Sequence, residues 1–194
     1  VSTLQNKSEK IRFVRAVDLN LGASQQIAAQ HSLELSSDLG DALEDAEVEA
    51  IVLATPHSLH EAQILAAASA GKHVFCEKPL ALTRESAEKS VAACDAAGII
   101  LGLGHERRFE PAMIEIKDLI KSGSLGDIMH VEANFSHDKL ANLPADNWRV
   151  STKESPAAGM TATGIHLTDA YMSMFGSVEE VYAHTARRNP ANLN

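Results

Sequence analysis

The sequence predicts an α/β protein whose first part is a doubly wound parallel sheet. Short apolar runs alternate with helical patterns from residue 11 to about residue 104. Alternating strands and helices are typical of a parallel sheet with helices on both faces. One of the runs, residues 50–54 (AIVLA), is apolar throughout, which suits a strand buried on both faces of such a sheet.

The individual elements of this first part follow from local signals. Residues 11–17 (IRFVRAV) predict a strand that ends at Asp18, and residues 50–54 predict a strand that stops at Thr55-Pro56. Further strands are expected over residues 73–76 (HVFC) and 99–103 (IILGL), and helices over residues 22–29, 60–70 and 83–97, the last capped by Thr83. Gly71 and Gly98 are expected to end the second and third of these helices.

The pattern changes in the second part of the chain. We place the domain boundary at about residues 105–126, which gives a first domain over residues 1–104 and a second over residues 105–194. In the second domain we expect a helix from Pro111 to Gly123, with Met113, Ile116 and Ile120 on one face. A strand over 128–135 with one face in water and a polar loop to about 158 should follow. The last expected elements are a helix over 160–175 and a strand over 178–184.

Composition excludes several classes of protein. The 26 acidic and 17 basic residues give a net charge of −9, and no basic cluster is present, so a nucleic-acid-binding protein is not expected. No apolar run reaches the roughly 20 residues that a membrane helix needs. Cys76 and Cys94 are too few for a disulfide scaffold and too isolated for a zinc site, and we expect both to be reduced and partly buried in a cytoplasmic protein.

Chemically useful side chains follow the ends of the predicted strands. They are Asp18, Thr55-Pro56, Glu77-Lys78-Pro79 and the residues from Gly104 to Arg107. Ligands of open α/β sheets bind beyond the carboxyl ends of the strands, so this edge is the predicted binding site. Asp18 could accept hydrogen bonds from the ribose of an adenosine, or it could be a turn aspartate. Lys78 could donate to a substrate oxygen, or it could be a surface lysine.

The histidines offer two further constellations. His57 and His60 have the spacing of a metal pair, but no third ligand is evident, so we favour capping or hydrogen bonding to a cofactor and expect no metal. His166 precedes Asp169 by one helical turn, and such a pair can orient an imidazole for acid–base work. The alternative is a structural histidine. The sequence Gly102-Leu-Gly104 is not a phosphate loop, because Arg107 takes the place of the third glycine.

Taken together, these positions resemble the glucose–fructose oxidoreductase, inositol dehydrogenase and rhizopine catabolism (Gfo/Idh/MocA) family from about residue 11 to about residue 184. The ordered set consists of Thr55-Pro56-x-x-x-His60, Ala70-Gly71-Lys72-His73-Val74, Glu77-Lys78-Pro79-Leu80-Ala81, Arg107-Arg108-Phe109-x-Pro111, Gly123-x-x-Gly126, Trp148-Arg149 and Gly164-Ile165-His166-x-x-Asp169. Each motif is short, and the order of the whole set makes the resemblance specific.

The resemblance implies a Rossmann domain that holds NAD, or NADP, followed by part of an α+β substrate domain with an open, mostly antiparallel sheet. It implies an oxidoreductase that acts on a hydroxyl carbon of a sugar, cyclitol or related polyol, and a homo-oligomer when full length. Lys78 and His166 would be catalytic. The cofactor would contact Asp18, Thr55, Pro56, His60, Glu77, Lys78, Pro79 and Arg107, and the substrate would contact Lys78, Trp148, Arg149, His166 and Asp169.

This sequence departs from the family pattern in several ways. The glycine-rich turn of the first βα unit is missing, so we expect an internal fragment that lacks both ends. Ala162 stands where the family often has an aspartate, and Glu106 stands where asparagine is common. The changes leave two alternatives open: a non-catalytic protein that binds a dinucleotide or sugar, and a lyase or hydrolase that recycles its NAD.

Overall fold

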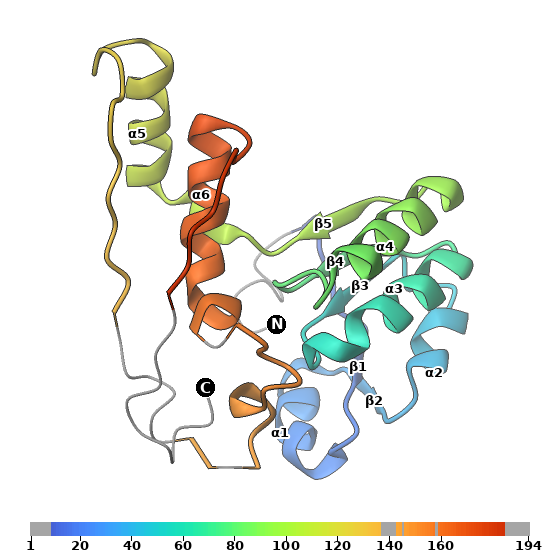
Figure 1. Ribbon diagram of the computed structural model, residues 1–194. Helices are drawn as coiled ribbons and strands as arrows, with labels where there is room; N and C mark the ends of the chain where they lie inside the picture. The colour runs from blue at the N-terminus through green and yellow to red at the C-terminus, as the bar shows by residue number, and fades with distance from the viewer. Residues whose placement is uncertain (1–8, 137–142, 145, 158, 185–194) are drawn as a thin grey trace. The chain divides into compact units, whose positions relative to one another are not determined.

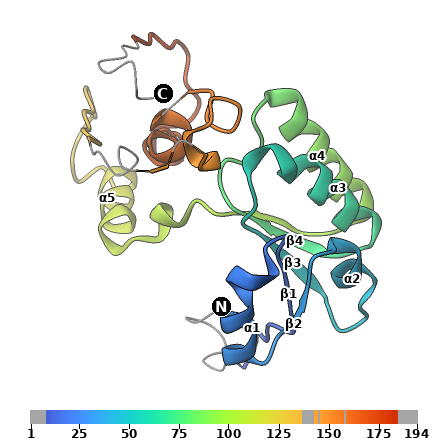
Figure 2. The same cartoon turned by 90° about the horizontal axis from the view of Figure 1, so that it is seen from below.

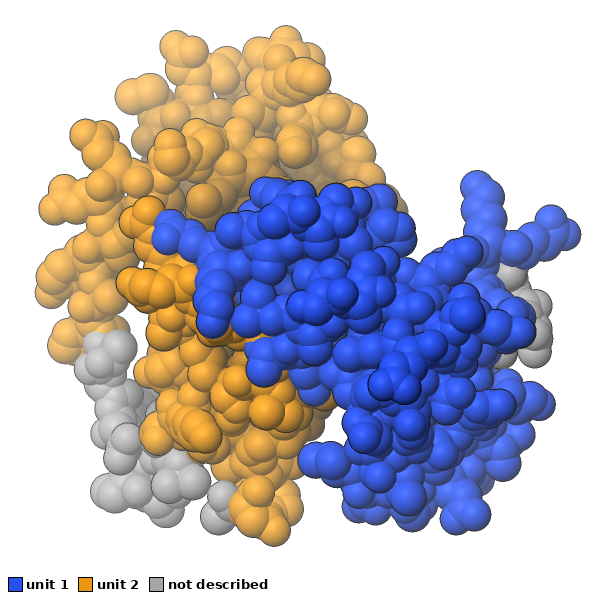
Figure 3. Space-filling model, turned by 90° about the vertical axis from the view of Figure 1, so that its right-hand side faces the viewer, with its two compact units in different colours: residues 1–53, 62–75, 88–102 blue, residues 54–61, 76–87, 103–194 orange. Residues whose placement is uncertain are grey.

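The computed structural model describes residues 9–136, 143–144, 146–157 and 159–184, and it divides into two compact units (Figure 3). Unit 1 comprises residues 1–53, 62–75 and 88–102, and unit 2 comprises residues 54–61, 76–87 and 103–194. The chain passes from unit 1 to unit 2 where strands end. Unit 2 therefore collects the segments that follow the carboxyl ends of three strands.

The first ladder of unit 1 is a parallel pair. Strand β1 (Arg15–Val17) pairs with β2 (Glu34–Ser36), and α1 (Leu21–His31) connects them (Figure 1). The side chain of Asn20 caps α1 by accepting a 3.1 Å hydrogen bond from the Ala23 amide. The predicted strand ends where expected but begins at Arg15 rather than Ile11. Strand β2 and helix α2 (Leu39–Glu44) were not predicted, because elements of three and six residues are too short to show a periodic pattern.

The second ladder has the order β3-β4-β5, formed by β3 (Ala50–Leu53), β4 (His73–Cys76) and β5 (Leu101–Leu103). The Val74 amide donates to the Ile100 carbonyl at 2.9 Å and the Gly104 amide donates to the Cys76 carbonyl at 2.8 Å, so β4 and β5 advance in the same direction. Helices α3 (His60–Ser69) and α4 (Arg84–Ala97) connect these strands in turn. The predicted alternation of strands and helices is confirmed.

Only one face of the second ladder is buried. In β3, Ile51 and Leu53 are buried while Val52 is 55% exposed, and in β4 Phe75 is 44% exposed. Helices α3 and α4 lie side by side (Figures 1 and 2), and Ile64 of α3 is completely buried. The prediction that residues 50–54 are buried on both faces is wrong, because the described residues cover these strands on one face only.

Unit 2 contains two longer helices. Helix α5 (Pro111–Lys121) begins at the predicted proline, and Gly123 follows it with a positive φ of 73°. Helix α6 (Ile165–Phe175) is preceded by a π-helical turn (Met160–Gly164), so the predicted helix over 160–175 is confirmed with a wider first turn. The described part of the unit also has three 3₁₀ turns: His57–Leu59, Glu106–Phe109 and Trp148–Val150.

The strands predicted over residues 128–135 and 178–184 are not formed. Both segments are irregular, with Met129 89% exposed and Tyr182 91% exposed. A β-strand is held by hydrogen bonds to a neighbouring strand, and among the described residues neither segment has one. Part of the predicted polar loop, residues 137–142, 145 and 158, lies outside the described residues. None of the helices in the described part of the chain is long and apolar enough to span a membrane.

Candidate active site

Lys78 occupies the turn after β4 and is fixed at both ends. Its Nζ donates a 2.7 Å hydrogen bond to the carbonyl of Ala162 in the π-helical turn. Its backbone amide donates to Oε2 of Glu77 at 3.2 Å, and the Lys78–Pro79 peptide is cis. A Cβ on Gly104 would lie 3.2 Å from this carboxylate oxygen, so a glycine there leaves room for Glu77. The alternative of a freely exposed surface lysine does not fit this geometry.

His60 joins the turn after β3 to the turn after β4. Its Nδ1 lies 2.9 Å from the carbonyl oxygen of Pro79, and its Nε2 lies 3.1 Å from the carbonyl oxygen of Thr55. The side chain is completely buried. His60 therefore fixes the two turns that carry Thr55-Pro56 and Lys78. Contact of Thr55, Pro56 and His60 with a cofactor stays a prediction.

His166 lies in the first turn of α6, four residues after Ala162. The side chain is 7% exposed, and its Nδ1 is buried without a hydrogen-bond partner among the described residues. The carboxylate of Glu106 is close by, with its Oε2 4.0 Å from Nδ1. Burial lowers the pKa of His166, and the charge of Lys78 lowers it further. The imidazole is therefore neutral at neutral pH and can accept a proton.

Asp169 does not pair with His166. Its carboxylate receives two hydrogen bonds from Arg108, of 2.6 Å from Nε and 2.5 Å from a terminal nitrogen. The same carboxylate lies 3.7 Å from Nδ1 of His105. The fork of an arginine matches both oxygens of a carboxylate, and such charge-assisted pairs are the strongest hydrogen bonds in proteins. The structure therefore does not form the possible His166–Asp169 pair, and contact of Asp169 with a substrate stays a prediction.

Three buried nitrogens gather near His166 without a hydrogen-bond partner in the described part of the chain. They are Nδ1 of His105, Nε of Arg107 and Nδ1 of His166. The rings of His105 and His166 are T-shaped with centroids 6.0 Å apart. An unsatisfied buried polar atom costs about 1–3 kcal/mol, so this cluster fits a polar ligand that supplies the missing partners. The carboxamide and ribose of a nicotinamide nucleotide have such groups.

Trp148 and Arg149 lie on a 3₁₀ turn that packs against His57. The indole meets the His57 ring edge-on at 5.0 Å, and the Arg149 guanidinium lies 4.3 Å above the indole. Nδ1 of His57 donates a 2.6 Å hydrogen bond to the Glu154 carbonyl. Because Nδ1 is committed to this bond and both His60 nitrogens face carbonyls, the metal-pair alternative is not supported. The described residues contain no group of three or more metal-ligating side chains.

Glu154 is a buried residue that sequence reasoning missed. Its Oε2 accepts a 2.8 Å hydrogen bond from the Ser58 amide, and its Oε1 accepts a 2.5 Å bond from the Ser58 hydroxyl. Burial alone would raise the pKa of Glu154, but the two bonds from Ser58, together with the nearby His57 and Lys153, outweigh it and the pKa is lowered. A single glutamate in a polar loop carries no sequence signal for such a contact.

Asp18 belongs to unit 1 and follows β1. Its Oδ1 accepts a 2.8 Å hydrogen bond from the Asn20 amide, and its Oδ2 accepts one from the Ser24 hydroxyl. The bond from Ser24 and the bond from Asn20 lower its pKa. The turn role expected as the alternative is therefore present. A carboxylate accepts about four hydrogen bonds, so the half-buried Asp18 retains capacity for a ribose.

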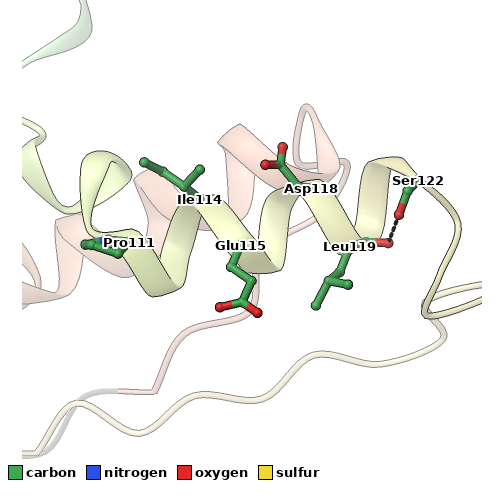
Figure 4. A pocket seen from close by; sticks show the side chains of 6 residues that line it. All are labelled: Pro111, Ile114, Glu115, Asp118, Leu119 and Ser122. Carbon is green, nitrogen blue, oxygen red and sulfur yellow. Dashed lines mark hydrogen bonds between the residues drawn. The ribbon is translucent and has the colours of Figure 1, made fainter.

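A pocket in unit 2 lies along helix α5 and is separate from these residues (Figure 4). It is lined by Pro111, Ile114, Glu115, Asp118, Leu119 and Ser122. The lining side chains come from successive turns of a single helix and its C-terminal cap. None of them is among the predicted site residues, so this pocket is not the candidate active site.

Comparison with known proteins gives two family matches. Residues 1–105 match a model described as an oxidoreductase family with an NAD-binding Rossmann fold. Residues 113–193 match the GFO/IDH/MocA C-terminal domain. These matches confirm the Rossmann-type fold. The division between domains at residue 105 stays a prediction, and the two compact units do not follow it.

Individual relatives agree with the family models. A scyllo-inositol 2-dehydrogenase (NADP(+)) from Bacillus subtilis is 32% identical over 152 residues, which cover 78% of this chain and 41% of the relative. A 2,7-anhydro-N-acetylneuraminate hydratase from Mediterraneibacter gnavus is 29% identical over 177 residues, 91% of this chain and 46% of the relative. The crystal structure of an oxidoreductase domain protein from Kribbella flavida is 30% identical, with a TM-score of 0.75 over 82% of this chain and 44% of that chain. The chain spans less than half the length of these relatives.

Proposed function

We propose, because this chain belongs to the GFO/IDH/MocA family of oxidoreductases, that the protein transfers a hydride between the nicotinamide of NAD(P) and a hydroxyl-bearing carbon of a sugar, cyclitol or related polyol. The observation that carries this proposal is the link between Lys78 and the turn that precedes His166. The Lys78 ammonium group bonds to the carbonyl of Ala162, four residues before the buried imidazole. The hydrogen bond thus ties the Lys78 ammonium group to the segment that carries the neutral imidazole of His166.

These two side chains can divide the work of alcohol oxidation. A bound nicotinamide would supply the acceptor for the hydride. His166, neutral because burial and Lys78 lower its pKa, would accept the hydroxyl proton. Lys78 would donate a hydrogen bond to the substrate oxygen and stabilise the negative charge that develops on it. Reduction of a carbonyl reverses these proton movements.

The remaining predicted contacts complete the proposal. Asp18, Thr55, Pro56, His60, Glu77, Pro79 and Arg107 would hold the dinucleotide, and Trp148, Arg149 and Asp169 would face the substrate. Asp18 favours NAD, because a carboxylate accepts from the ribose hydroxyls and repels a 2′-phosphate. The relative from Bacillus subtilis is named for NADP(+), so both cofactors belong in the test. The free, buried Cys76 and Cys94 suit a cytoplasmic protein, and we expect a homo-oligomer.

A second candidate is a lyase or hydratase that restores its cofactor in each turnover. The relative from Mediterraneibacter gnavus is named a hydratase, which favours this reading. The two candidates differ in the fate of the cofactor. An oxidoreductase accumulates reduced or oxidised cofactor in proportion to product, whereas a recycling enzyme forms product with no net change in the absorbance of NADH.

The first experiment is a titration with NADH and NADPH that follows nicotinamide fluorescence, on this chain and on the longest natural chain that contains it. We expect binding of NADH that Asp18→Ala weakens about 10- to 100-fold, as for loss of hydrogen bonds to a charged group. Asp38→Ala is the matched control, because Asp38 also accepts from a backbone amide, that of Gly40, at 2.8 Å. Absence of binding to either cofactor by the folded natural chain would remove the oxidoreductase proposal.

A cofactor-binding protein is then screened with a panel of polyols and sugars. Net formation of NADH with one of them supports the dehydrogenase. Product without net NADH supports the recycling enzyme, and binding without any turnover across the panel supports the non-catalytic alternative.

A further inference from the structure

The loop that follows Trp148 and Arg149 is fastened to a distant turn by one buried carboxylate. Glu154 is 7% exposed, and both of its carboxylate oxygens accept hydrogen bonds from Ser58, 96 residues earlier in the sequence. Its carbonyl accepts a third bond, of 2.6 Å, from Nδ1 of His57. Burying a carboxylate costs free energy unless its oxygens are hydrogen-bonded. The bonds from Ser58 therefore make this a specific contact.

The electrostatic setting of Ser58 explains how the charge is accommodated. Ser58 lies in the 3₁₀ turn His57–Leu59, which runs directly into helix α3 (His60–Ser69). The free amides at the start of a helix carry partial positive charge and favour an anion. Glu154 therefore acts as a cap supplied by a segment 96 residues later in the sequence.

The contact also fixes Trp148 and Arg149. The amide of Ser155 donates to the Ser151 carbonyl at 2.9 Å, the amide of Ser151 donates to the Trp148 carbonyl at 3.1 Å, and the Ser155 hydroxyl donates to the Arg149 carbonyl at 3.3 Å. The segment from Trp148 to Ser155 is thus one compact loop. Its indole rests against His57, the neighbour of Ser58.

We propose that Glu154 is a positioning residue that holds Trp148 and Arg149, the expected substrate contacts, against the turn after β3 that is expected to hold the dinucleotide. Its role in substrate binding rests on the proposed function; its role in placing Trp148 does not. Glu154 joins the loop of Trp148 and Arg149 to the turn after β3 and does not itself touch the reacting atoms. Loss of its carboxylate should therefore weaken substrate binding more than it slows the chemical step.

Trp148 is the only tryptophan in the sequence, so its fluorescence reports on this loop alone. Glu154→Gln removes the charge with little change in shape, and Ser58→Ala removes the hydroxyl donor without touching the loop. Thr152→Ala is the control, because Thr152 is an exposed neighbour on the same loop. We expect both Glu154→Gln and Ser58→Ala to shift the Trp148 emission to longer wavelength and to raise its quenching by acrylamide, whereas the control resembles the wild type.

The kinetic arm uses a substrate identified in the polyol screen. We expect Glu154→Gln to raise KM on the order of tenfold, with kcat nearly unchanged, as for a lost hydrogen bond to a charged group. The double variant with Ser58→Ala should be no worse than the single one. Wild-type emission and quenching in Glu154→Gln and in Ser58→Ala would overturn the proposal. If no polyol reacts, the proposed function fails while the fluorescence arm still decides the placement of Trp148.

Discussion

The ammonium group of Lys78 donates a 2.7 Å hydrogen bond to the main-chain carbonyl of Ala162. Ala162 lies in the π-helical turn Met160–Gly164, where the wider winding departs from the usual i to i−4 bonding. The acceptor is a main-chain oxygen, so this bond does not depend on the side chain at residue 162. The position of the Lys78 ammonium group is therefore tied to the shape of the turn.

Replacement of Lys78 by alanine should lower kcat far more than it weakens cofactor binding. The ammonium group is the donor proposed for the developing oxyanion, and loss of one such donor costs about 100- to 1,000-fold in kcat. Steady-state kinetics and NADH titration of Lys78→Ala measure the two effects. Lys72→Ala is the matched control, because Lys72 also donates to a main-chain carbonyl, that of Asp45, at 2.8 Å. A kcat within threefold or so of the wild type would contradict the role of Lys78.

A carboxylate introduced at residue 162 should raise the pKa of His166. Ala162 precedes His166 by four residues, and residues at this spacing share a helix face. A nearby negative charge favours the imidazolium, so we expect the pKa of His166 to rise by roughly one unit in Ala162→Asp. An NMR titration of the histidine ring protons measures it. Ala162→Asn is the control of equal size without charge, and an equal pKa in the two variants would show that the new side chain does not reach the imidazole.

Glu106 should be the carboxylate that tunes His166 in the natural sequence. Its Oε2 lies 4.0 Å from Nδ1 of His166, and its charge opposes the lowering of the pKa by burial and by Lys78. Glu106→Gln should therefore lower the pKa of His166 further and shift the acidic limb of the rate profile to lower pH. The effect is modest, because the Glu106 side chain is 64% exposed. Glu110→Gln is the control, because Glu110 is a nearby glutamate that pairs with Arg107. The same NMR titration measures the pKa of His166 in both variants.

Local signals account for the elements that the sequence predicts well. Strand β4 (His73–Cys76) has the predicted bounds, because Gly71 and the Glu77–Pro79 turn flank its apolar run. Helix α5 starts at the predicted Pro111, because proline is favoured at the first position of a helix. The alternating run over 128–135 shows which side chains share a face, but it cannot show whether a partner strand exists.

In the candidate site, too, local signals reveal some residues and miss others. The sequence singles out Lys78, because a proline follows it at the end of a strand, and His166, because it lies in a predicted helix. The Glu154–Ser58 contact joins residues 96 positions apart, and no spacing in a single sequence reveals it. The pairing of Asp169 with Arg108 was equally hidden, because helix periodicity places Asp169 near His166 and says nothing about Arg108, which is 61 residues earlier in the sequence.

The thiol of Cys76 should be inert in the folded chain. Cys76 is completely buried, and burial raises its pKa to about 12. The thiolate is the reactive form, so almost none is present at neutral pH. We expect Ellman's reagent to label neither Cys76 nor the buried Cys94 under native conditions and to label both in guanidinium chloride. Mass spectrometry assigns the sites, and rapid native labelling at Cys76 would contradict its burial.

The stability of the chain should fall as the pH drops below about 6.5. Burial lowers the pKa of His57, His105 and His166 from the ordinary value of 6.5. Below that value the unfolded chain binds protons that the folded chain does not, so the free energy of unfolding decreases with pH until the folded imidazoles also titrate. His105→Phe removes one of these groups and should reduce the slope. Urea unfolding between about pH 8 and about pH 5 measures the slope, and His130→Gln, at an exposed histidine, is the control. If His105→Phe and the wild type lose stability equally, His105 is not buried as a neutral imidazole.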